Sequence, residues 1–405
     1  MKFFKRAYCR VFQGVMRVVL PLLPYREPEI LEQNSQVSQT LKKLNCKKVF
    51  FVTDKVIRGL NLTQALETEL KNAGLQVVVF DDVLPNPTIS LIEQGKDLYI
   101  KEKCDCIIAL GGGSVIDCAK VVGARVVKPN QTVRSMKGLL KVNKKLPPFV
   151  AIPTTAGTGS ETTIAAVVTD DKTHHKYAIN DFSLIPHYAL LDYNLTLGLN
   201  GKITSTTGMD ALTHAVEAFI GRSTTKKTRQ ASLDAVKLIS ENLKEVYDNP
   251  TNANARQNML KASYLAGVAF TKSYVGYCHA VAHTLGGEYG VAHGLANAIL
   301  LPVVLKQFDS AVHKKLAQLA VHINLAEKDT PINIAANKFI EWIENLNKHF
   351  NIPTCVEQLQ ERDIPRLAKL ADKEANPLYP VPKLMDASEL ENIYHRVLKD
   401  ALYGN

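Results

Sequence analysis

The chain has 405 residues, 46% of them hydrophobic and 22% charged, and its formal net charge at pH 7 is +10. These values are typical of a globular protein, so they exclude intrinsic disorder and collagen-like repeats. The length suits two or three domains. The excess of basic residues suggests a nucleic acid or an anionic membrane as a possible partner. The lysines and arginines are scattered, however, so we interpret the charge as a solvated surface and expect no nucleic-acid partner.

The seven cysteines form an odd set without CxxC spacing, and most lie in apolar runs. Such a set is typical of reduced, mostly buried thiols, and we predict a cytoplasmic location. We expect Cys104 and Cys106 in the core of the protein and Cys278 beside a candidate metal ligand.

The amino-terminal segment is basic and has no acidic residue before Glu27. A basic start followed by the apolar residues 18–24 resembles a signal sequence. Arg17 interrupts that apolar character, no clear cleavage site follows, and the run is too short to span a bilayer. We therefore expect an amphipathic helix that packs on its own domain, with contact to a membrane surface as the alternative.

Strand and helix patterns alternate from Lys47 onward. The expected strands are residues 47–53, 76–80, 106–110 and 149–152. Thr63 and Thr88 are candidate N-caps of helices that end near Asn72 and Lys101. This alternation predicts a parallel sheet covered by helices on both faces.

Two polar loops follow expected strands. Residues 111–114, three glycines and a serine, precede a helix that ends near Val127, and backbone N–H groups at a helix start suit a pyrophosphate. Residues 153–161 contain four hydroxyl residues and two glycines. The first loop matches neither GxGxxG nor a P-loop, so an ordinary tight turn is the alternative. Together the loops favour nucleotide binding, because ligands bind at the carboxyl ends of parallel strands.

Beyond Asp192 helical periodicity dominates, and helices are expected at residues 229–247, 255–270, 332–350 and 387–402. We place a boundary near residue 195. Residues 1–195, with a basic extension at 1–27, form an α/β dinucleotide-binding domain, and residues 196–405 form an all-helical domain. We expect the active site in the cleft between these domains.

Asp210 and His214 are four residues apart in an expected helix, and so are His279 and His283, whereas His293 follows a glycine-rich interval. Side chains four apart share a helix face. A carboxylate with several imidazoles suits a divalent transition metal. The alternative is a set of hydrogen-bonded core or surface histidines. Spacing alone does not choose among the last three histidines, and a purely geometric choice would take both pairs and omit His293.

The motifs and their order closely resemble the iron-containing (group III) alcohol dehydrogenase family. The likeness rests on residues 111–120, 153–163, 208–217 and 279–294, and it extends from about residue 28 to residue 377. The resemblance implies an N-terminal Rossmann-like parallel-sheet domain followed by an all-helical metal-binding domain, an arrangement like that of dehydroquinate synthase.

The resemblance also implies roles for individual residues. The metal ligands would be Asp210, His214, His279 and His293, in place of the geometric choice of His283, which would lie beside the substrate and relay a proton. The dinucleotide site would be lined by Asp54, Asn86, Gly112, Gly113, Ser114, Asp117, Thr154, Thr155, Thr158 and Lys176. We expect Fe(II), with zinc as the alternative. We expect NAD in preference to NADP, because Asp54 ends the first long strand, where a carboxylate binds ribose hydroxyls and repels a 2′-phosphate.

The implied activity is hydride transfer between NAD(H) and a small alcohol or aldehyde, in a homo-oligomeric enzyme. Dehydroquinate-synthase-like lyases also combine NAD with a metal, but they need basic residues for a phosphate-bearing substrate. The ligand segment here offers Leu285, Tyr289 and Val291 instead. Glycerol-dehydrogenase-like polyol oxidation is a closer alternative. A binding protein derived from a dehydrogenase is a third, and the intact ligand set argues against it.

Overall fold

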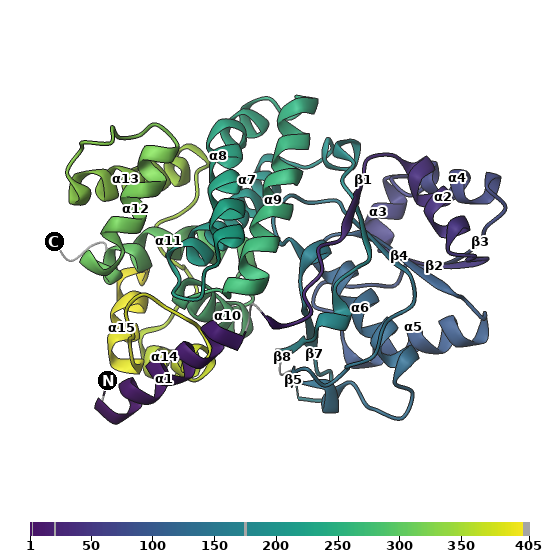
Figure 1. The fold of residues 1–405 in the computed structure, drawn as a ribbon, viewed down its shortest axis with the longest axis horizontal. Coiled ribbons are helices and arrows are strands. Elements are labelled where there is room, and N and C mark those ends of the chain that lie inside the picture. The colour runs from purple at the N-terminus through teal and green to yellow at the C-terminus, as the bar shows by residue number, and fades with distance from the viewer. Residues whose placement is uncertain (2, 20–21, 174–175, 400–405) are drawn as a thin grey trace. The chain divides into compact units, whose positions relative to one another are not determined.

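The structure, a computed structural model, describes residues 1, 3–19, 22–173 and 176–399. The chain divides into two compact units (Figure 1). Pro24–Gly198 forms one, called here the α/β unit, and Met1–Leu23 joins Leu199–Asn405 in the other, called the helical unit. The chain passes from the α/β unit to the helical unit after Gly198, close to the boundary expected near residue 195. The amino-terminal segment, expected with the first domain, instead groups with the helical unit because its contacts are made there.

The α/β unit is built on a six-stranded sheet in which all neighbouring strands are parallel. In spatial order the strands are β1 (Glu29–Leu31), β9 (Tyr188–Leu190), β6 (Phe149–Pro153), β4 (Cys106–Gly111), β2 (Lys48–Val52) and β3 (Gln76–Phe80). The last four match the expected strands to within one residue at each end. β1 and β9 were not expected, because three residues are too few to show a periodic pattern.

Both faces of this sheet are buried. Phe50 and Ile107 belong to one core cluster, whereas their neighbours Phe51 and Ile108 belong to the other. Successive side chains of a strand point to opposite faces, so a strand covered on both sides appears as an uninterrupted apolar run. The expected parallel α/β domain is confirmed.

The helices of this unit are α2 (Asn34–Lys43), α3 (Lys55–Gly59), α4 (Gln64–Asn72), α5 (Ile89–Lys101) and α6 (Gly113–Val127). Side chains of α5 and α6 enter one core cluster, and side chains of α2 and α4 enter the other. Thr88 caps α5, since its hydroxyl accepts the N–H of Leu91 at 3.3 Å. Thr63 precedes α4 as expected, but its side chain makes no capping bond.

A second, smaller sheet was not expected. It contains β5 (Gly138–Leu139), β8 (Lys176–Asn180) and β7 (Ala165–Thr169) in that order, and β7 and β8 are antiparallel. Strands β7 and β8 of this sheet follow the second polar loop in the chain, and the N–H of Val167 in β7 donates to Asp117 Oδ2 at 3.0 Å. The strand that follows the loop is therefore hydrogen-bonded to α6.

The helical unit contains α1 (Phe3–Val19), α7 (Gly201–Ile220), α8 (Lys226–Asp248), α9 (Ala253–Ser273), α10 (Tyr277–Tyr289), α11 (His293–Phe308), α12 (Ser310–His322), α13 (Ile332–His349), α14 (Ile364–Ala375) and α15 (Ala387–Arg396). The expected all-helical domain is confirmed. The helix expected at residues 387–402 ends at Arg396, and residues 400–402 lie outside the described part of the chain. Among the described residues, none of the helices combines the length and the apolar character that a membrane span requires.

Candidate functional site

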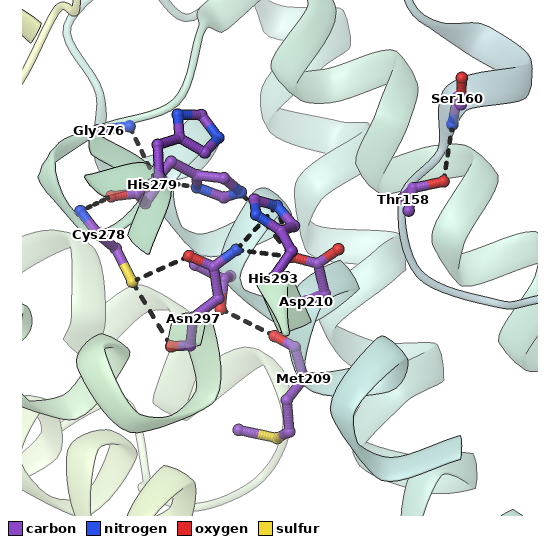
Figure 2. A network of polar contacts seen from close by, with 12 residues as sticks. Thr158, Ser160, Met209, Asp210, Gly276, Cys278, His279, His293 and Asn297 are labelled. Atoms are coloured by element: carbon purple, nitrogen blue, oxygen red, sulfur yellow. Dashed lines mark hydrogen bonds and ion pairs between the residues drawn. The ribbon is translucent and has the colours of Figure 1, made fainter. Parts of the chain in front are cut away.

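Four candidate metal ligands converge in the helical unit from three helices. Asp210 and His214 lie one turn apart on α7, His279 lies in the first turn of α10, and His293 is the first residue of α11. One possible ligand atom of each lies within 4.8 Å of the others. Figure 2 shows His279, His293 and Asp210 directed toward one another. A carboxylate with three imidazoles is a donor set that suits zinc or iron.

A sharp return of the chain brings His293 to this group. α10 is capped at its carboxyl end by Gly290, whose φ of +68° is in the left-handed region that favours glycine. α11 then begins against α7, so closely that a Cβ on Gly294 would lie 2.4 Å from the carbonyl oxygen of Thr206. This close contact leaves Nε2 of His293 3.4 Å from Oδ1 of Asp210.

Glu217, for which the sequence suggested no role, orients His279. Its Oε2 lies 2.6 Å from Nδ1 of His279, and its two oxygens accept the N–H groups of Gly276 and Cys278 at 2.8 Å each. We assign the imidazole proton to Nδ1 from this contact, which leaves the Nε2 lone pair available for a metal. That Nε2 is buried without a hydrogen-bond partner among the described residues. A buried nitrogen in this state is unusual unless it binds an ion, so the residues fit a cation.

Burial shifts the pKa values of both His279 and Glu217. It lowers the pKa of His279 well below the usual value, and the neighbouring His214, His293 and His283 act in the same direction. The imidazole is therefore neutral, the form that binds metals. Burial also raises the pKa of Glu217 to about 7, against the opposing effect of the N–H groups that it accepts.

Asn297 supports the same group from α11. Its Nδ2 donates to Asp210 Oδ1 at 2.7 Å and lies 3.2 Å from Nε2 of His293 (Figure 2). The side chain is fully buried. The spacing of four residues from His293 was the sequence signal that could have identified it.

The four ligand candidates differ in exposure. Asp210, His214 and His279 are buried, whereas 36% of the His293 side chain is exposed. The group is therefore closed on one side and open at His293, as metal sites that admit a small molecule are.

His283 lies outside the group of four. Its Nδ1 is 2.6 Å from Oε1 of Glu374, which also accepts the hydroxyl of Tyr379 at 2.9 Å. Its ring stacks on that of His293, with centroids 5.3 Å apart. Four residues of an α-helix rise about 6 Å, so His283 lies one turn beyond His279 on the same face. The four residues that the family resemblance implied as ligands thus lie together, and His283, which spacing alone would choose, lies beside them.

The α/β unit brings the two polar loops to one edge of its sheet. Gly111 and Pro153 are paired in the register of β4 and β6, and the N–H of Thr154 donates to the carbonyl of Gly111 at 3.1 Å. A Cβ on Gly113 would lie 3.0 Å from Cγ2 of Thr158, so the loops are in close contact. α6 starts at this edge, and its first N–H groups supply partial positive charge there.

Three other predicted cofactor residues form a chain of contacts. The N–H of Asn86 donates to Ser114 Oγ at 3.3 Å, and Nζ of Lys176 donates to Asn86 Oδ1 at 2.7 Å. Thr155 and Thr158 are partly exposed and Thr154 is buried. A Cβ on Gly112 would meet nothing within 4 Å, so the backbone at the start of α6 is open to approach there.

The carboxylates of Asp117 and Asp54 already have partners within the protein. Asp117 accepts the hydroxyl of Ser160 at 2.7 Å in addition to the N–H of β7, so it supports the second loop. Asp54 follows β2 and caps α3, with its Oδ1 accepting the N–H of Ile57 at 2.8 Å. Asp117 is therefore placed to shape the loop, whereas Asp54 has one oxygen engaged as a helix cap.

A second group of possible ligands, Cys46, Asp105 and Cys106, lies in the α/β unit. Both oxygens of Asp105 accept backbone N–H groups, from Lys47 and Lys48 at 2.7 and 3.1 Å. The group offers little beyond two thiols, and we assign no metal to it. All seven cysteines are free thiols, and Cys104 and Cys106 are buried as expected. Cys278, next to the ligand candidate His279, is buried as well.

Comparison with known proteins identifies the family. The family model described as "Iron-containing alcohol dehydrogenase" matches residues 31–193, and the model "Fe-containing alcohol dehydrogenase family, C-terminal" matches residues 204–398. The chain belongs to the iron-containing alcohol dehydrogenase family. The expected family, fold class and enzyme class, an oxidoreductase that acts on CH–OH groups, are confirmed.

Individual relatives cover most of the chain. The 1,3-propanediol dehydrogenase of Citrobacter freundii is 38% identical over 89% of this chain and 94% of its own length. The NAD-dependent methanol dehydrogenase of Bacillus methanolicus is 35% identical over 83% of this chain and 88% of its own. The crystal structure of a 1,3-propanediol oxidoreductase matches with a TM-score of 0.88 at 34% identity, over 92% of this chain and 99% of that one.

Proposed function

We propose that this protein is a metal-dependent dehydrogenase that interconverts a small alcohol and its aldehyde with NAD(H). The observation that supports this most directly is the convergence of Asp210, His214, His279 and His293. Among the described residues, Nε2 of His279 in this group is buried without a hydrogen-bond partner. One divalent metal would be held per chain by these four side chains. We propose iron on the basis of the family, since the donor set itself also accepts zinc.

The two units divide the chemistry in this proposal. The helical unit holds the metal, and the α/β unit binds the dinucleotide. The α/β unit, Pro24–Gly198, takes the place of the dinucleotide-binding domain predicted at residues 1–195. When bound, the metal supplies a Lewis acid for the substrate oxygen and the dinucleotide supplies the hydride acceptor or donor. The protein's own task is to hold, orient and exchange protons with the substrate.

His283 is our candidate for the proton exchange. Oxidation of an alcohol to an aldehyde releases a proton from the hydroxyl group, and an imidazole is the usual acceptor near neutral pH. Glu374 holds Nδ1 of His283 at 2.6 Å, which directs Nε2 away from the carboxylate. The side chain is 39% exposed, so a proton accepted there can pass to water.

The proposed dinucleotide contacts are the two loops and the residues linked to them, Asp54, Asn86, Gly112, Gly113, Ser114, Asp117, Thr154, Thr155, Thr158 and Lys176. The start of α6 favours an anionic pyrophosphate through its N–H groups. NAD is favoured over NADP by the charges around Asp54. The nearby cations Lys55 and Arg58 are paired with Asp82 and Asp81 at 2.7 and 3.7 Å, which leaves little free positive charge for a 2′-phosphate.

An uncharged alcohol or diol is the proposed substrate class. Residues 277–293, which carry His279, His283 and His293, contain no lysine or arginine. A phosphate-bearing substrate, as a dehydroquinate-synthase-like lyase would need, has no cation there to bind it. The relatives described above are named for propanediol and methanol. A homo-oligomeric state and a cytoplasmic location remain predictions.

One experiment tests the proposal. The protein is purified without oxygen, its metal is determined by elemental analysis, and NAD or NADP reduction is followed with a panel of primary alcohols, diols and glycerol. We expect about one divalent metal per chain, activity that chelation abolishes and Fe(II) restores, and a preference for NAD. Full activity in a metal-free preparation, or no redox activity with any alcohol, would contradict the proposal.

A further inference from the structure

The amino-terminal helix α1 packs on the helical unit through its polar side. Cys9 and Gln13 are its buried residues. Nε2 of Gln13 donates to the carbonyl of Tyr379 at 2.7 Å, and the guanidinium of Arg10 donates to the carbonyl of Val381 at 2.9 Å. Figure 1 shows α1, in purple, alongside α14 and α15. Hydrogen bonds to backbone carbonyls of residues 379 and 381 therefore hold this helix in place, with little apolar burial.

The opposite side of α1 carries large apolar side chains that face solvent. We call these five residues the apolar stripe: Phe4, Tyr8, Val11, Val15 and Val18. Their exposed fractions run from 56% for Val15 to 85% for Phe4. At about 100° per residue they lie within about 80° of one another and opposite Gln13. A surface helix normally buries such a stripe and exposes its polar side, so α1 is docked in the reverse orientation. An apolar strip of this kind marks an interaction surface.

The charge around the stripe is positive. The described residues of α1 include four basic side chains and no acid. Lys5 is paired with Asp372 at 2.6 Å, but Arg6 and Arg17 are exposed. Cations of the rest of the unit lie close enough to α1 for mutual repulsion, Arg222 with Arg10 and Lys315 with Arg17. The partner of the stripe must therefore tolerate, and preferably neutralise, a basic helix.

A second copy of the chain meets this requirement poorly. Two-fold symmetry places the same surface on both sides of an interface, so two acid-free basic helices would be brought together. Anionic phospholipid headgroups instead supply the missing negative charge, and helices with an apolar stripe and a basic polar side lie in the interfacial layer of bilayers. We propose that α1 docks this protein on the surface of an anionic phospholipid bilayer, with the apolar stripe inserted among the headgroups.

Co-sedimentation of the full-length, metal-loaded enzyme with vesicles tests this proposal. Vesicles of phosphatidylcholine alone are compared with vesicles that also contain phosphatidylglycerol, at low salt. We expect binding to the anionic vesicles at least about tenfold stronger than to the neutral ones. The double substitution Val11→Asp with Val15→Asp should lower that binding by at least about tenfold, since it places charge in the stripe. The matched control, Ile332→Asp with Ile334→Asp, adds the same charge at exposed apolar positions of α13 and should bind like the wild type.

A charge variant provides an independent test. Arg6→Gln with Arg17→Gln leaves the stripe intact, and we expect it to weaken anionic binding roughly 25-fold, about fivefold for each cation near the surface. Alcohol dehydrogenation and metal content should be unchanged in every variant, which shows that the fold is intact. Vesicle binding and dehydrogenase activity are measured separately. This proposal can therefore fail while the proposed function holds, and the proposed function can fail while this proposal holds.

Three results would overturn the proposal. The first is no binding of the wild type to anionic vesicles. The second is equal binding to neutral and anionic vesicles. The third is a smaller sedimentation coefficient of the stripe variant than of the wild type without vesicles, since the stripe would then be an interface between copies of the chain.

Discussion

Oε2 of Glu217 lies 2.6 Å from Nδ1 of His279, and the two residues belong to different helices, α7 and α10. The same face of α7 also carries Asp210 and His214. One helix therefore supplies two ligand candidates and the carboxylate that orients a third. The buried contact fixes the imidazole with Nε2 toward Asp210, so the geometry of the group depends on Glu217 as much as on the ligands themselves.

Replacing Glu217 by Gln should weaken metal binding about 10- to 100-fold, because an amide accepts the imidazole proton less strongly than a carboxylate does. Metal affinity is measured by competition with a chelator of known affinity. Glu241→Gln, an exposed change on α8, is the control and should retain metal like the wild type. Unchanged affinity in the Glu217 variant would show that the contact does not serve the metal.

Gly276→Ala should also lower metal retention, because a Cβ there would lie 2.6 Å from Oε1 of Glu217 and must displace that carboxylate. We expect a loss of about tenfold or more in metal affinity. Gly287→Ala is the matched control on the same helix. A Cβ on Gly287 meets nothing within 4 Å, so this variant should keep its metal and gain up to about 1 kcal/mol of stability. Equal metal loss in both variants would point to a general effect on α10.

His279→Ala and His283→Ala should fail in different ways. Loss of His279 removes one of four donors, so metal and activity should be lost together. Loss of His283 should leave the metal bound and lower turnover by up to about 10²- to 10⁴-fold, with a changed pH–rate profile, if it exchanges the substrate proton. Metal content measured beside the profile decides between these roles. Metal loss from the His283 variant alone would restore the ligand choice based on spacing.

Asp54→Asn should raise the catalytic efficiency with NADP relative to NAD by about tenfold, because it removes the charge that repels a 2′-phosphate. Asparagine still caps a helix, so α3 should remain intact. Asp192→Asn, at another capping aspartate, serves as the control for loss of a charged cap. An unchanged ratio of the two efficiencies in the Asp54 variant would show that this carboxylate does not set the preference.

Glu161 should make stability depend on pH. Neither carboxylate oxygen has a hydrogen-bond partner among the described residues, and burial raises the pKa to about 7 from 4.5. Below about pH 4.5 the carboxyl group is protonated in both states. Between about pH 4.5 and 7 the unfolded chain releases the proton first, so the folded state loses stability, on the order of 3 kcal/mol in total.

Thermal unfolding at pH 5 and pH 7.5 checks this effect. The melting temperature of Glu161→Gln relative to the wild type should rise with pH, since glutamine carries no proton to lose. Glu241→Gln should show no such trend. A constant difference between the Glu161 variant and the wild type at both values would mean that the carboxyl is ionised in the folded protein.

Much of the architecture follows from local sequence. Apolar runs bounded by polar residues predicted β2, β3, β4 and β6, and helical periodicity predicted α8, α9 and α13, because these elements bury enough side chains to leave a clear pattern. The short strands β1 and β9 gave no such pattern. The glycines between β4 and α6 also predicted a loop that approaches a ligand closely, since glycine has no side chain to prevent it.

Which side chains meet was decided by the tertiary structure. His279 and His283 are four residues apart, as Asp210 and His214 are. Spacing therefore identified candidate metal ligands but could not choose among the histidines. Only the turn at Gly290 and the close contact of α11 with α7 place His293 beside Asp210. Helical periodicity likewise showed that α1 is amphipathic, but its polar side faces the protein, because hydrogen bonds to backbone carbonyls hold it there. Periodicity determines which residues share a face, and only long-range contacts determine what that face touches.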